Sequence, residues 1–132
     1  MDNQDKVKII EAAGRNDIGA LRGLVREDAR LDFFALDGLT PLINASKNGA
    51  KDAVYFLLSN GANPNYLGDG VTSPAYWAAI NCHSEEFGMI VKAGGNIRLP
   101  KFAMHSFPER LIQCKDKSFS QLVLARLADE ER

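Results

Sequence analysis

The chain has 132 residues, of which 45% are hydrophobic and 25% charged, and its formal net charge is -1. This length allows one domain with a hydrophobic core, and the near-neutral charge excludes a strong general attraction to nucleic acid or membranes. No stretch reaches the roughly 18 consecutive apolar residues of a membrane span, and residues 1–5 lack the basic segment and apolar run of a signal peptide.

The first predicted elements are two helices whose residues match a second pair 33 positions later. Ala12-Ala13 stands 33 residues before Ala45-Ser46, and Leu24-Val25 stands 33 residues before Leu57-Leu58. Self-similarity at a fixed period of this length is the signature of a repeat protein, in which each unit is one supersecondary element. The sequence therefore predicts a solenoid of stacked units.

The second unit has the clearest helix signals. Thr40 can cap the N-terminus of its first helix, and Pro41 suits the first helical position, where its missing N–H is not needed. The next helix carries Val54, Leu57 and Leu58 at spacings i, i+3 and i+4, which is typical of an apolar stripe that faces a core. This unit is predicted to be a helix, a turn and a second helix.

The later units repeat this plan with larger departures. Ser73-Pro74 stands where the preceding unit has Thr40-Pro41, and the last unit begins with the capping-box pattern Ser106-x-x-Glu109. The first and last units are the least regular, as expected of units with one face toward water. The predicted units are 5–36, 37–69, 70–103 and 104–132, within a single domain over 1–132.

The run Asp37-Gly38-Leu39-Thr40-Pro41-Leu42, followed by Ala45, Gly49 and Gly61-Ala62, resembles an ankyrin repeat. The resemblance implies an all-α solenoid of helix-turn-helix units joined by β-hairpin-like loops, which binds another protein through its concave face and hairpin tips. It also implies a histidine after Thr-Pro-Leu that bonds between repeats, but Ile43 and Tyr76 occupy the two equivalent positions. We expect the chain to be a monomer when free.

Residues on the exposed side of the first helices and at the hairpin tips are the candidate contacts with a partner protein. Trp77 either fills a gap between units or is an exposed aromatic anchor, and Ile80, one helical turn on, favours the second interpretation. The candidate set is Arg15, Phe34, Leu36, Leu39, Asn44, Lys47, Asn48, Leu67, Asp69, Thr72, Trp77, Ile80, Asn81, Lys101, Phe102, Met104 and His105.

Other functions find less support in the sequence. Residues 92–127 hold seven bases and two acids, so an acidic ligand or nucleic acid could bind the C-terminal unit, with Lys101 and His105 supplying the bias. Cys82-His83, His105 and Cys114 are zinc-type ligands, but their spacing fits no metal motif. We therefore predict no enzyme activity and no cofactor.

The cysteine content bears on the cellular compartment. Two cysteines are too few for a disulfide framework, which favours a reducing, cytoplasmic environment. Secretion through a signal that is not visible in the sequence is the alternative.

Overall fold

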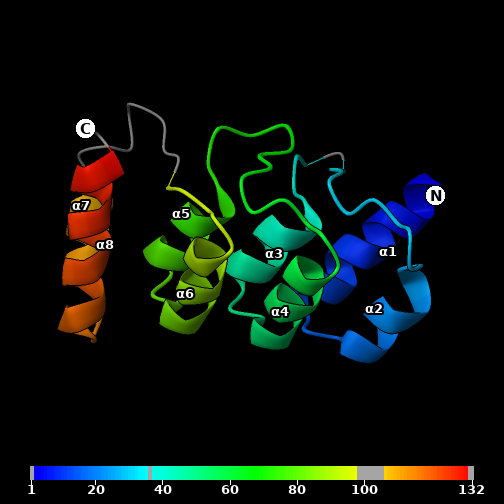
Figure 1. Ribbon diagram of the computed structural model, residues 1–132, viewed down its shortest axis with the longest axis horizontal. Coiled ribbons are helices and arrows are strands. Elements are labelled where there is room, and N and C mark those ends of the chain that lie inside the picture. Colours follow the sequence, from blue (N-terminus) through cyan, green and yellow to red (C-terminus); the bar gives the residue numbers. More distant parts are fainter. Residues whose placement is uncertain (1, 36, 98–105, 131–132) are drawn as a thin grey trace.

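The computed structural model describes residues 2–35, 37–97 and 106–130. Within them the chain forms α-helices and no β-strand, which confirms the predicted all-α solenoid. The helices follow one another as neighbouring pairs along a single axis, and the described loops between pairs emerge at one edge of the stack (Figure 1). The helices are α1 (Asn3–Gly14), α2 (Ile18–Leu24), α3 (Pro41–Lys47), α4 (Lys51–Ser59), α5 (Pro74–Ile80), α6 (Ser84–Lys92), α7 (Ser106–Ile112) and α8 (Lys117–Glu130).

The first helices α1, α3 and α5 begin at side-chain caps, as predicted for the second unit. Thr40 accepts a hydrogen bond from the Ile43 backbone N–H at 2.9 Å, and Pro41 is the first residue of α3. Ser73 caps α5 in the same way through the Tyr76 N–H at 3.3 Å. These caps supply acceptors to N–H groups that have no partner inside the helix.

The core is one continuous cluster that runs through all four helix pairs. Alanines on the first helices, such as Ala45 and Ala78, have no exposed surface, so the backbones of neighbouring first helices can lie close together. On the second helices, Val54 and Leu57 are fully buried and Leu58 is partly buried against the same core, as their spacing predicted. The first helices α1, α3, α5 and α7 therefore form one layer, and α2, α4 and α6 stack as a second.

The turn between the helices of a pair has the same left-handed backbone in three consecutive units. Asn16, Gly49 and Cys82 stand 33 residues apart and have φ angles of 59°, 66° and 61°. Glycine and asparagine adopt this region most readily, because a Cβ atom crowds the backbone there. Cys82 is therefore the unusual member of the series.

Polar side chains also connect neighbouring units. Asn16 accepts a hydrogen bond from the Ala53 N–H at 2.8 Å and so caps α4, whose own N-cap residue, Ala50, provides no side-chain bond. Asn65 donates to the Gly94 carbonyl at 3.0 Å and accepts from the Asn96 N–H at 2.8 Å. Contacts of this kind fix the register of one unit on the next.

A disulfide between Cys82 and Cys114 joins the third helix pair to the fourth. The cysteine count predicts reduced thiols, because two cysteines are too few for a disulfide framework. The structure instead joins them in a disulfide. Their separation of 32 residues is close to one repeat, so the two cysteines fall in corresponding turns of adjacent units. The repeat period was the signal that could have predicted the pair.

Candidate functional site

A cavity of about 270 Å³ opens between the tips of the two described inter-repeat loops. Its walls come from the second and third units, so stacking of two units creates it. We call it the hairpin-tip pocket. It is lined by Asp37, Gly38, Leu39, Ile43, Leu67, Asp69, Gly70, Thr72 and Trp77.

The two loop tips meet closely because Gly68 has no side chain. Its φ is +64°, and a Cβ atom placed on it would lie 2.7 Å from Thr40 Cγ2 and 2.8 Å from the Gly38 carbonyl oxygen. In the first loop, the Asp37 carboxylate accepts a hydrogen bond from the Leu39 N–H at 3.2 Å, which holds the turn. The pocket mouth is therefore built from two turns that support each other.

Trp77 forms part of the pocket wall and is partly buried. Its ring packs edge-on against Tyr76 with centroids 5.2 Å apart, and the Lys47 Nζ lies 4.9 Å from its centroid. Both contacts restrict the indole ring, and the second is a cation–π interaction. Trp77 thus packs within the solenoid while it still faces an open cavity.

The environment of Tyr76 supports this arrangement. Tyr76 is buried and also packs against Phe107 of α7, with ring centroids 5.3 Å apart. Burial raises the pKa of its hydroxyl above the ordinary value of 10.0, and the charge of Arg110 lowers it by a smaller amount. The ring that supports Trp77 therefore stays neutral at physiological pH.

Five of the predicted contact residues meet at this pocket: Leu39, Leu67, Asp69, Thr72 and Trp77. Lys47 joins them through its position over the indole ring. The predicted set did not include Ile43, although the sequence shows that Ile43 stands where an ankyrin repeat usually has a histidine.

Ile80 corrects one prediction. Its side chain was expected on a wet face beside Trp77, but the residue is only 6% exposed and belongs to the core. The short helix α5 packs between α3 and α7, which covers this position. Ile80 therefore cannot serve as a second anchor.

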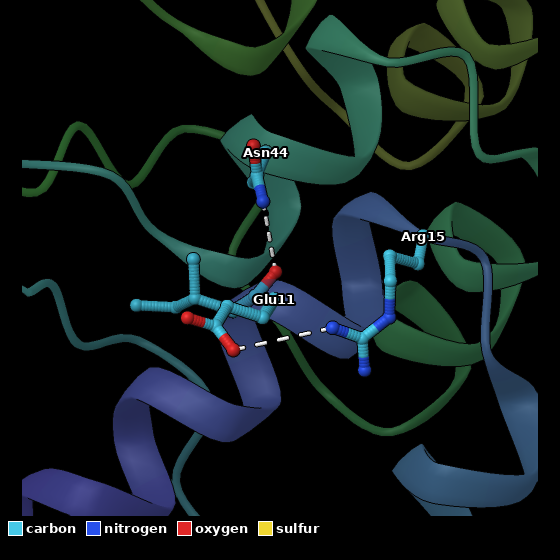
Figure 2. A network of polar contacts seen from close by, with 4 residues as sticks. Glu11, Arg15 and Asn44 are labelled. Carbon is cyan, nitrogen blue, oxygen red and sulfur yellow. Dashed lines mark hydrogen bonds and ion pairs between the residues drawn. The ribbon is translucent and has the colours of Figure 1, made fainter.

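The predicted residues Arg15, Asn44 and Asn48 make polar contacts apart from the pocket, and Figure 2 shows those of Arg15 and Asn44. Asn44 donates a hydrogen bond to the Ile10 carbonyl at 2.9 Å, and Arg15 lies 4.0 Å from the Glu11 carboxylate. Asn48 donates to the Asn44 carbonyl at 2.8 Å. Asn44 thus replaces, between the first two units, the kind of inter-repeat bond expected from the absent histidine.

The remaining predicted residues lie apart from the pocket or outside the described part of the chain. Asn81 donates hydrogen bonds to the carbonyls of Lys47 and Trp77, each at 3.2 Å, so its amide also connects units. Phe34 is 45% exposed on the first loop. Outside the described residues are Leu36, Lys101, Phe102, Met104 and His105.

Two other hollows differ in character from the hairpin-tip pocket. One, of about 340 Å³, lies between α4 and α6 and includes Tyr55, Leu58 and Met89. The other, of about 700 Å³, lies at the N-terminal end, where charged residues of both signs such as Lys6, Asp28 and Arg30 predominate. Among the described residues no group of three or more histidine, cysteine or acidic side chains could hold a metal ion.

Comparison with known proteins decides the family. A family described as ankyrin repeats (3 copies) matches residues 9–100. The chain belongs to the ankyrin-repeat family. It is also similar to neurogenic locus notch homolog protein 1 of Danio rerio, at 30% identity over 96 residues that make up 72% of this chain and 4% of that protein.

Family membership sets a general expectation for function. Ankyrin repeats generally serve as protein–protein interaction modules, and the family is typically non-enzymatic. No helix in the described residues is long and apolar enough to cross a membrane. The scaffold alone does not specify a partner, because function depends on the particular side chains that it presents.

Proposed function

We propose that this chain binds a segment of a partner protein at the hairpin-tip pocket, with Trp77 as the central anchor. The observation that carries the proposal is the position of the chain's one tryptophan in the wall of a cavity shared by two units. Tryptophan is enriched among the residues that contribute most to protein–protein binding.

The size of the cavity suits a partner side chain. Its volume of about 270 Å³ lies near the lower limit of the roughly 300–1,000 Å³ of typical small-molecule sites. One or two apolar side chains of a partner would fill this space and displace water from it.

The pocket is also preorganised for binding. Tyr76 and Lys47 already restrict the Trp77 ring, and the Gly68 contact already fixes the two loop tips against each other. Ordering a mobile side chain at an interface costs about 0.5–1.5 kcal/mol. A partner that docks here avoids much of this cost.

The rim of the pocket provides polar groups that would orient the partner. Asp37 and Asp69 are exposed on the loop tips, and Lys47 is exposed on α3. The two carboxylates favour a basic group of the partner on the loop side, and Lys47 favours an acidic group on the helix side. Such pairs at an interface rim contribute more to orientation and association rate than to affinity.

Quantitative affinity capture tests the proposal. Immobilised wild-type protein, the double variant Leu39→Glu/Trp77→Ala and the matched control Tyr55→Ala are each incubated with native lysate. The proteins that each one retains are then compared. Tyr55 is a 68% exposed aromatic residue of the separate α4–α6 hollow. Circular dichroism confirms that each variant keeps its helices.

The proposal predicts a protein that wild type and Tyr55→Ala retain equally and that the double variant loses. In a titration with that protein, Trp77→Ala alone should raise Kd at least about 30-fold, which corresponds to the roughly 2 kcal/mol of a hot-spot residue. Equal retention by all three would contradict the proposed site and direct attention to the basic C-terminal unit.

A further inference from the structure

We propose that Cys82 and Cys114 form a reversible thiol–disulfide site that controls how firmly the last helix pair is held to the solenoid. The first observation is geometric. The two Cα atoms lie 5.6 Å apart, within the range that a disulfide spans without backbone movement.

The second observation is the backbone position that Cys82 occupies. At the equivalent turns the chain has Asn16 and Gly49, the residue types best suited to a left-handed conformation. Conformational preference therefore does not explain a cysteine at position 82. Its sulfur provides what asparagine and glycine lack, namely a covalent link.

The third observation is that this turn position already connects units elsewhere in the stack. Asn16 reaches forward to the Ala53 N–H and the Asp52 carboxylate of the next unit, at 2.8 Å and 3.3 Å. Cys82 reaches forward in the same sense, to Cys114 of the unit that follows it. Between the third and fourth units, a disulfide thus occupies the position that hydrogen bonds occupy between the first and second units.

Among the described residues, aromatic contacts also cross the interface that the disulfide spans. Tyr76 packs on Phe107, and Phe87 packs edge-on against Phe119, with ring centroids 5.3 Å and 5.5 Å apart. These contacts join α5 to α7 and α6 to α8. The disulfide adds a covalent attachment at the turns, so its opening would leave the last helix pair attached by non-covalent contacts.

Accessibility indicates which sulfur reacts. Cys82 is exposed, whereas Cys114 is only 2% exposed. Thiol–disulfide exchange requires the attacking thiolate to reach one of the two sulfurs. An external thiol, either a small thiol or a redox protein's dithiol, would therefore attack Cys82 Sγ.

In that step the new bond forms between the external sulfur and Cys82 Sγ while the bond to Cys114 Sγ breaks. Cys114 leaves as a thiolate and takes up a proton. A second external thiol then cleaves the mixed disulfide and releases Cys82 as a thiol. Overall, two external thiols are oxidised to their disulfide as the protein disulfide gains two electrons.

The state of this site would follow its surroundings. Disulfides persist in oxidising compartments and are reduced by glutathione and thioredoxin systems in the cytosol. The last helix pair would therefore be clamped in an oxidising environment and released from its covalent link in a reducing one.

Trapping experiments with glutathione test the direction of attack. Folded Cys114→Ser and Cys82→Ser variants are incubated with oxidised glutathione, and adducts are followed by intact-protein mass spectrometry. We expect the adduct at Cys82 in Cys114→Ser to form at least about 10-fold faster than the adduct at Cys114 in Cys82→Ser, because exchange depends on access. In urea, where both cysteines are exposed, the rates should become similar.

Hydrogen exchange of the wild-type protein tests the consequence. With dithiothreitol, amides of α7 and α8 should exchange faster while those of α3 and α4 stay unchanged. Two outcomes would overturn the proposal: thiols that stay free after incubation of wild type with oxidised glutathione, or identical exchange of α7 and α8 in both redox states.

Discussion

Substitutions of Asn16 can separate two contributions to stability, that of its side-chain cap on the next unit and that of its left-handed backbone. Its side chain accepts the Ala53 N–H at 2.8 Å, and its φ is 59°. Loss of a helix cap costs about 1 kcal/mol, and a left-handed alanine costs roughly another 1 kcal/mol. Asn16→Ala should therefore destabilise the protein by about 2 kcal/mol, and Asn16→Gly, which tolerates the turn, by about 1 kcal/mol.

Urea denaturation followed by circular dichroism measures both variants. With a slope of about 2 kcal/mol/M, the midpoint should fall by roughly 1 M for Asn16→Ala and roughly 0.5 M for Asn16→Gly. Equal midpoints for the two variants would refute the argument from backbone conformation. A glycine variant as stable as wild type would show that the cap across the repeat interface contributes nothing.

The remaining predictions concern two glycines, a tyrosine and the disulfide. Gly49→Ala should destabilise the protein more than Gly61→Ala in thermal denaturation: both glycines have positive φ, but only at Gly49 would a Cβ atom crowd the His83 ring, at 2.6 Å. The disulfide joins two cysteines that are 32 residues apart in the sequence. Its reduction should lower the free energy of unfolding by about 4 kcal/mol in the chain-entropy model, and a loss below about 1 kcal/mol would contradict that model here. Burial raises the Tyr76 pKa above 10.0 in the folded protein, so the folded chain holds this proton more tightly than the unfolded chain does. The resulting stabilisation is fully present below pH 10.0 and is lost as the pH rises through the raised pKa. The stability of Tyr76→Phe should accordingly fall less steeply above pH 10, as measured by urea denaturation at several pH values; parallel pH profiles would contradict this.

The solenoid was predictable because repeat proteins carry the same local signals in each unit. Thr40-Pro41 and the stripe at Val54 and Leu57 each determine local structure, and the 33-residue period repeats that structure along the chain. Propensity, capping and patterning thus favour the same fold.

The site was predictable only in part, because burial between units depends on how helices pack. Trp77 and Ile80 are three residues apart on one short helix, yet one faces a pocket and the other lies in the core. The period could identify equivalent positions in successive units, but it could not show which of these positions neighbouring helices cover. The cysteine pair was missed for a different reason, since counting cysteines ignored their equivalent positions in adjacent units.

The most direct test of the proposed function uses the single tryptophan as a probe. Incorporation of 5-fluorotryptophan at position 77 gives one ¹⁹F resonance, free of signal from any tryptophan of the partner. We predict that the captured partner shifts this resonance and protects it from solvent perturbation, while the α4–α6 variant Tyr55→Ala behaves identically. Saturating binding that leaves the resonance unchanged would show that the partner docks elsewhere, and would contradict the central claim.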